Sequence, residues 1–490
     1  MNIMMKKKTM IWAVFLILLY SILNIIILIH HEPCGDEAQA WLIARDLDIG
    51  SIFRQMNYEG SPALWHILLL PLAKTGLPYI SESILHLIIA VSAVVVFIQY
   101  APFSKITKLL FIFSYYMAYE YSIIARSYSL SILLLFVIAA LYNKRFKYAL
   151  WYSFLIFLLF NTNVHSFFIA TSLTIVFAWE LYRYKVKVNF AKISVFVMFM
   201  GGVLSFLQLL PQPDNMNYGI FTRIEILAPI VAIANAFYPW IIDFFIPTNL
   251  RLIFMGFSFL IFFTVVLSLY KTPAVLFILS LSLSGLFYIF VFKYLGALRH
   301  HGLILIMLFF ALWISTYYNN SQKIISHMPS NINIPKISIL LINICLTMSL
   351  LYSLKTQYLE YQYIYSGAKE MSDFIRRNKL YDYNIIAHPS PPASALLPYL
   401  PEKSFWYADI KDYGTFITYN TNYLIGSNIS DSEVIARMRK VFPDQSKILL
   451  LLTAPLDSHE LHNFRLFYKV EKVLYGREKY YLYKSVSEEL

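Results

Sequence analysis

The sequence has few charged residues and few cysteines. Only 14% of its 490 residues are charged, whereas soluble domains carry about 25%. Its two cysteines, Cys34 and Cys345, define neither a disulfide framework nor a metal site. No basic cluster is interleaved with aromatic side chains, so the net charge of +12 does not indicate nucleic-acid binding. These shortages argue against an ordinary soluble protein, a disulfide-rich secreted protein and a nucleic-acid partner.

Long apolar runs are frequent in the sequence. Hydrophobic residues make up 59% of the chain, and apolar runs recur from Met10 to Leu354. A helix needs about 20 mostly apolar residues to cross a bilayer. The first run, 10–30, is too long for a signal-peptide core and no small-residue cleavage site follows it, which predicts a retained first helix. We therefore expect a polytopic α-helical membrane protein.

The spacing of the runs predicts about eleven transmembrane helices. Their expected ranges are 10–30, 82–101, 109–122, 128–142, 148–161, 166–182, 193–211, 250–270, 273–293, 302–318 and 337–354. Short loops on one side carry most of the loop Lys and Arg, which the positive-inside rule places in the cytoplasm. This orientation predicts a multi-pass protein of the inner (plasma) membrane. The first loop, about 31–80, the loop 212–249 and the C-terminal tail then lie outside the cytoplasm.

The acidic residues support this orientation. Before residue 300, only Glu180 is expected at the inner face, and no acidic residue occurs between Asp243 and Glu360. We therefore expect acid-dependent chemistry on the outer side of the membrane.

The composition changes near residue 356, where acidic residues return and apolar runs shorten. Residues 366–378 and 431–441 have helical spacing. The segments 384–388, 447–453 and 464–484 are typical of strands. The sequence thus predicts a transmembrane domain over 1–355 and an extracytoplasmic, soluble α/β domain over 356–490.

Two adjacent carboxylates follow the first helix, in the stretch His31 to Asp46 (HEPCGDEAQAWLIARD). We predict that Asp36 is the N-cap of a short helix and that Glu37 follows it. A carboxylate held beside a bilayer is suited to act as a general base. The alternative is a capping arrangement on a solvated loop.

Further polar residues are expected at helix ends on the same side. The predicted substrate-binding residues are Glu120, Arg126, Tyr128, His165, Arg299, His300 and His301. Ionisable groups at membrane depth are costly and are functional candidates for that reason. The alternatives are an interfacial ion pair between Glu120 and Arg126 and a hydrogen-bonded interfacial histidine at His165. The pair of histidines is too weak a signal to predict zinc.

Four motifs together resemble the GT-C glycosyltransferases over about residues 1–310. They are Asp36-Glu37, Glu59-Gly-Ser-Pro62, Tyr119-Glu-Tyr-Ser-Ile-Ile-Ala-Arg126-Ser-Tyr128 and Arg299-His-His-Gly302. The nearest branch is similar to the protein O-mannosyltransferases and includes the lipid A aminoarabinose transferase. Ser61-Pro62 stands where that branch often has two prolines.

The resemblance implies an inverting glycosyltransferase of cell-envelope glycan biosynthesis. Its donor would be a polyprenyl-phosphate-linked sugar, and its acceptor a hydroxyl of a glycan, lipid or protein. Asp36 would be the base, with Glu37 as its neighbour in the motif, and Arg126 and Arg299 would bind the lipid phosphate.

The chemistry of such a transfer fits these residues. A departing phosphate gains negative charge, which arginine neutralises with paired hydrogen bonds. A divalent metal ion between Asp36 and Glu120 is compatible with this chemistry but is not required, because the arginines supply positive charge. We assign no metal ligands.

Two other functions remain open. A lipid-linked glycan flippase or another transporter predicts buried charges near mid-membrane and paired broken helices, often in inverted repeats. An O-antigen-type polymerase is also polytopic and has arginines on the outer side. That function does not explain why the Asp36-Glu37 pair is present in the first loop.

Overall fold

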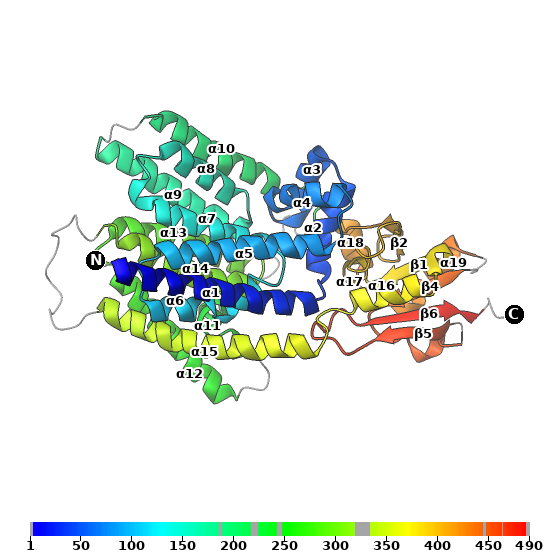
Figure 1. Cartoon of the computed structure of the whole chain (residues 1–490). Helices are drawn as coiled ribbons and strands as arrows, with labels where there is room; N and C mark the ends of the chain where they lie inside the picture. The colour runs from blue at the N-terminus through cyan, green and yellow to red at the C-terminus, as the bar shows by residue number, and fades with distance from the viewer. Residues whose placement is uncertain are drawn as a thin grey trace. The chain divides into compact units, whose positions relative to one another are not determined.

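The computed structural model describes residues 3–185, 189–216, 224–242, 247–318, 334–443, 447–462 and 464–486 (Figure 1). The chain forms two compact units. The helical unit comprises 1–25, 85–209 and 219–357, and the mixed unit comprises 26–84, 210–218 and 358–490. The first loop predicted from the sequence therefore belongs to the same unit as the C-terminal segment.

Among the residues described, nine helices are long and apolar enough to cross a membrane. They are α1 (Ile3–His30), α5 (Ile80–Tyr100), α7 (Ser127–Leu141, continued by η2, Tyr142–Lys144), α9 (Val164–Arg183), α10 (Ala191–Leu209), α12 (Thr248–Ser268), α13 (Pro273–Phe292), α14 (Leu298–Ser315) and α15 (Ile334–Gln362). The chain is therefore a polytopic helical membrane protein.

The other two predicted spans correspond to shorter elements. Residues 109–122 are divided between α6 (Lys105–Ile112) and a π-helix, η1 (Tyr116–Glu120). Residues 148–161 form α8 (Ala149–Phe160), whose 12 residues measure about 18 Å, against about 30 Å of bilayer core. The count of eleven spans stays a prediction.

The predicted loop 212–249 contains structure that the sequence analysis missed. Helix α11 (Ala228–Phe237) packs against α14, and η3 (Pro239–Ile242) follows it. An apolar helix of 10 residues is too short to stand out as a span, so hydropathy alone did not reveal it. Asp243 lies outside the described residues.

Helix α14 lies in the core of the helical unit. Every residue from His300 to Ile314 is buried, as expected for a helix that is apolar on all sides. Phe309 packs against Phe111 with a ring-centroid distance of 4.1 Å, and Phe111 lies 4.5 Å from Phe97. This packing fixes the position of α14 within the unit.

The mixed unit begins with three helices, α2 (Gly35–Asp46), α3 (Ile49–Glu59) and α4 (Leu64–Lys74). Their contacts include a small apolar cluster of Ile43, Ile52, Met56 and Ala63. The sequence predicted the short helix that α2 forms, but it missed α3.

The rest of the mixed unit is built on one mixed sheet of order β3-β2-β1-β4-β6-β5 (Figure 1). Its strands are β1 (Asn384–His388), β2 (Phe405–Tyr407), β3 (Asp412–Gly414), β4 (Ile448–Leu452), β5 (Phe464–Val470) and β6 (Tyr480–Ser485). The other elements are α16 (Ala368–Arg377), η4 (Leu380–Asp382), α17 (Ser390–Ser394), α18 (Thr421–Gly426), α19 (Asp431–Val441) and η5 (Ser458–Glu460).

Strands β2, β1 and β4 pair in parallel at the centre of the sheet. All five residues of β4 are apolar and buried, as expected for a parallel strand covered on both faces. Val434 and Met438 of α19 pack against this core. The C-terminal α/β architecture, with a helix at 431–441, is confirmed.

Candidate functional site

The acid pair lies in the first turn of α2, in the mixed unit. The N-cap is Cys34, with extended backbone at φ −90° and ψ 175°, so the prediction that Asp36 is the N-cap is wrong. The helix begins earlier because Glu37 Oε2 accepts a hydrogen bond from the Cys34 amide at 2.9 Å. Glu37 thus caps the helix, and the half-buried Asp36 is its second residue.

Glu37 is also part of a buried charge cluster. His31 Nε2 lies 3.2 Å from Glu37 Oε2, and its Nδ1 bonds to Glu360. Burial by itself would lower the pKa of His31, but the two carboxylates outweigh it and raise this pKa to about 10. The imidazolium therefore ties the end of the first predicted helix to α2 and α15.

A second candidate site occupies the helical unit, where three helices begin close together. Tyr128, His165 and His300 lie in the first turns of α7, α9 and α14, respectively. The His165 and His300 rings stack with centroids 4.6 Å apart. The Tyr128 ring lies 5.6 Å from His300 and 6.0 Å from His165. Three helix N-termini, each with a partial positive charge, therefore converge here.

Two arginines accompany these N-termini. Arg126 is the N-cap of α7, and Arg299 is the second residue of α14. Burial of the Tyr294 hydroxyl, together with Tyr128, raises the pKa of Tyr294, although part of its ring is exposed. The charges of Arg299 and Arg126 act on the same hydroxyl in the opposite direction. Both guanidinium groups therefore lie in the neighbourhood of the ring cluster.

The histidines differ in the hydrogen bonds that they make. His300 Nδ1 accepts from the Ala297 amide at 2.8 Å and caps α14. His165 Nε2 bonds to the Tyr294 hydroxyl at 2.7 Å. His165 Nδ1 is buried without a hydrogen-bond partner among the described residues. In the tautomer in which Nε2 accepts the tyrosine proton, Nδ1–H is a donor available to a ligand.

His301 uses both ring nitrogens within the protein. Its Nε2 lies 3.0 Å from the Leu295 carbonyl, and its Nδ1 lies 3.1 Å from the Asn235 amide nitrogen. A neutral ring with the proton on Nε2 satisfies both bonds. His301 therefore holds the loop before α14 against α11, a structural role that the sequence did not indicate.

Glu120 is the last residue of the π-helix η1, and its Oε2 accepts a hydrogen bond from Tyr115 at 2.8 Å. The next residue, Tyr121, donates to the Arg299 carbonyl at 2.6 Å. Gly302 of α14 is needed here, because a Cβ at this position would lie 2.3 Å from the Tyr116 ring. The segment around η1 thus supports the start of α14, and π-helical turns are frequent at functional sites.

Several residues at the two sites were missed from the sequence. Tyr294 and His31 lie within the recognised motifs or beside them, but their spacing gave no reason to assign a role. Glu360 and Glu478 contact the start of the mixed unit but are far from Asp36 in the sequence, and no motif around them indicates a role.

Within the described ranges, no three His, Cys, Asp or Glu side chains are arranged to hold a metal ion. Cys34 and Cys345 are both buried and are not joined in a disulfide.

No protein-family model matches the chain, and no curated protein or solved structure is significantly similar to it.

Proposed function

We propose that the protein is a membrane glycosyltransferase that uses a polyprenyl-phosphate-linked sugar as its donor. The observation that supports it best is the convergence of three helix N-termini with Arg126 and Arg299 around Tyr128, His165 and His300. Helix N-termini and guanidinium groups both favour a bound phosphate. The buried Nδ1 of His165 adds a further donor for a phosphate or sugar oxygen.

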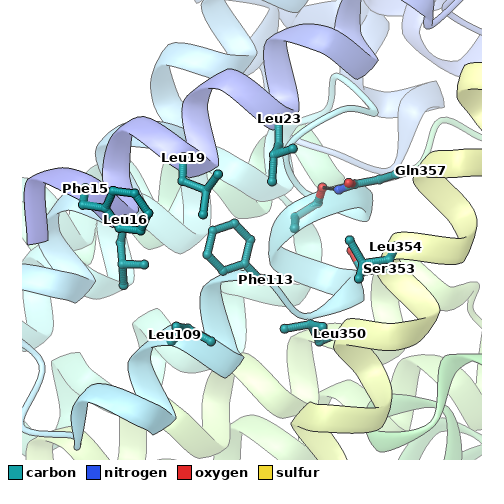
Figure 2. A pocket seen from close by; sticks show the side chains of 11 residues that line it. Phe15, Leu16, Leu19, Leu23, Leu109, Phe113, Leu350, Ser353, Leu354 and Gln357 are labelled. Carbon is teal, nitrogen blue, oxygen red and sulfur yellow. Dashed lines mark hydrogen bonds between the residues drawn. The ribbon is translucent and has the colours of Figure 1, made fainter. Parts of the chain in front are cut away.

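An apolar groove in the same unit suits the hydrocarbon chain of such a donor. It has a volume of about 210 Å³ and lies between α1, the segment 109–118 and α15. Figure 2 shows Leu19 and Leu23 of α1, Phe113, and Leu350 and Gln357 of α15 around it. Gln357 donates to the Ala118 carbonyl at 2.6 Å, which ties α15 to η1.

The groove and the cationic cluster share one structural support. Ala118 of η1 lines the groove, and Tyr121, directly after η1, donates to the backbone carbonyl of Arg299. A lipid phosphate has an apolar chain beside an anionic group, so an apolar groove and a cationic cluster in the same unit match its two parts. The proposed occupant of the groove is the polyprenyl chain of the donor.

In this proposal, Asp36 is the base that accepts the proton of the acceptor hydroxyl. The sugar C1–O bond to phosphate breaks as the acceptor oxygen bonds to C1, so the anomeric configuration inverts. The phosphate leaves as an anion that Arg126 and Arg299 neutralise. The proposed active face is extracytoplasmic, in an eleven-span inner-membrane protein.

The decisive experiment measures sugar transfer from labelled polyprenyl-phosphate sugars by the full-length protein in proteoliposomes. Wild type is compared with Asp36→Asn and Arg299→Ala. Matched controls are Asp382→Asn and Arg183→Ala, which remove exposed residues of the same type. Transfer by wild type and the controls, with loss in both site variants, supports the proposal. Equal transfer by Asp36→Asn overturns the assigned base and favours a flippase or a polymerase.

The groove has its own test. Leu350→Trp fills the groove, whereas Leu351→Trp changes a neighbouring side chain that is 61% exposed. We expect Leu350→Trp to raise KM for long-chain donors about tenfold and to leave short-chain donors unaffected, because a short chain does not need the groove. Equal KM values for long-chain donors in the two variants would place the chain elsewhere.

A further inference from the structure

A carboxylate from the C-terminal segment holds the start of α2. Glu478 precedes β6, and its side chain is buried, with 2% of the residue exposed. Its Oε1 accepts a hydrogen bond from the Gly35 amide at 2.8 Å. Its Oε2 accepts one from the Ser366 hydroxyl at 2.5 Å. Glu478 thus binds the residue directly before Asp36, from 443 positions along the chain.

The close approach depends on glycine at position 35. A Cβ there would lie 2.9 Å from the Pro391 carbonyl oxygen and 3.3 Å from Glu478 Oε1. The neighbouring Cys34 amide is bound by Glu37. The two consecutive amides before Asp36 are therefore each held by a different carboxylate, which leaves the backbone at the start of α2 little freedom.

The electrostatics of Glu478 link it to the acid pair. Burial raises the pKa of Glu478 to about 7, the bonds from Ser366 and Gly35 act against this rise, and the charges of Asp36 and Glu37 add to it. Glu478 therefore changes its charge near neutral pH. The titratable and charged groups around it are Cys34, Asp36, Glu37, Tyr399, Tyr475, Arg477 and Tyr480.

We infer that Glu478 is a positioning residue for Asp36. Its carboxylate fixes the first turn of α2 and so sets the direction in which the Asp36 side chain leaves the helix. The C-terminal segment then contributes to catalysis through α2 without touching substrate. The part of this inference that concerns catalysis rests on the proposed function.

A thiol probe tests the positioning without any assay of transfer. In full-length Cys345→Ser protein, Cys34 is the only remaining cysteine and is 4% exposed. We expect Glu478→Ala to raise the rate of Cys34 alkylation by maleimide about tenfold, because loss of the bond loosens the first turn. Glu478→Gln, which keeps an oxygen for the Gly35 amide, should stay close to the parent.

Glu471→Ala is the matched control, because Glu471 is an exposed acid of the same C-terminal segment. Cys34 should react at the parent rate in this variant. Equal alkylation rates in Glu478→Ala and Glu471→Ala would overturn the positioning role.

Transfer kinetics test the catalytic part. Glu478→Ala should lower kcat about tenfold or more and leave KM for the donor unchanged, since orientation of the base matters only in the reacting complex. Glu478→Gln should recover part of kcat and remove the change in the pH–rate profile near pH 7, because the group that titrates there is gone.

The two possible failures are distinguishable. If wild type transfers no sugar while Cys34 responds as expected, the proposed function fails and the structural role of Glu478 stands. If wild type transfers sugar and Glu478→Ala has the wild-type kcat and pH profile, the catalytic role is overturned.

Discussion

Two helices of this protein begin in the same way but carry opposite charge. In α2 the second residue is Asp36, and the third, Glu37, accepts a hydrogen bond from the N-cap amide at 2.9 Å. In α14 the second residue is Arg299, and the third, His300, accepts the corresponding bond at 2.8 Å. One backbone arrangement thus presents a carboxylate in one unit and a guanidinium in the other.

The difference shows how the capping residue sets the chemistry of a helix start. The neutral ring of His300 satisfies an amide without cancelling the partial positive charge of the helix, so α14 stays favourable to anions. Glu37 adds a full negative charge at α2, where His31 partly offsets it. The first arrangement suits phosphate binding and the second suits a base.

The largest expected effect is the loss of transfer when the carboxylate at the start of α2 is replaced. Asp36→Asn keeps the size of the side chain but removes the proposed base. We expect the transfer rate to fall by about 10²–10⁴-fold, the range typical of a lost general base, with normal protein level. Steady-state transfer in proteoliposomes measures this, with Asp382→Asn as the control. A fall of less than threefold would contradict the assignment of the base.

Replacement of the cation at α14 should have the next largest effect. We expect Arg299→Ala to lower kcat about 10²-fold, because the proposed charge-assisted contact to the leaving phosphate is lost. Arg299→Lys should recover only part of the rate, since an ammonium cannot form the paired bonds of a guanidinium. The same transfer assay measures both variants, and full activity of Arg299→Ala would remove Arg299 from the site.

The charge cluster at α2 predicts a loss of stability at alkaline pH. The pKa of His31 is raised from 6.5 to about 10 in the folded protein. Its contribution is therefore fully present below pH 6.5 and is lost as the pH rises to about 10. Thermal unfolding in detergent should show a lower Tm at pH 10 than at pH 7, by about 2–4 °C for each kcal/mol lost.

His31→Gln separates this effect from general alkaline damage. The variant should have a flatter dependence of Tm on pH between 7 and 10, because the group that titrates there is gone. Parallel curves for wild type and His31→Gln would contradict the assigned ion cluster.

The smallest expected effect concerns Glu478 and lies at lower pH. Its pKa is raised from 4.5 to about 7 in the folded protein, so the folded state binds the proton more tightly. Stability should therefore fall as the pH rises from 4.5 through 7 and change little above that. Glu478→Gln should flatten the Tm curve in this window, with Glu471→Gln as the control. An unchanged slope in Glu478→Gln would show that another group titrates there.

Some features of the protein follow from the sequence because they depend on local composition. Apolar runs of 15–21 residues marked the nine long helices in the described part of the chain, since crossing a bilayer requires about 20 mostly apolar residues wherever the run lies. The apolar run at Ile448–Leu452 marked a central strand for a similar reason. Asp36 stood out because adjacent acids directly after an apolar run are conspicuous in any context.

Other features were decided only by tertiary structure, because they depend on partners far away in the chain. Glu478 binds Gly35, and Glu360 binds His31, across more than 300 residues. The stack of His165 on His300 requires that α9 and α14 begin at one place. His301 looked equivalent to His300 in the sequence, but in the structure its Nδ1 is hydrogen-bonded to Asn235 of α11. Sequence patterns report the length and polarity of each element, whereas hydrogen bonds and ring contacts depend on which elements meet.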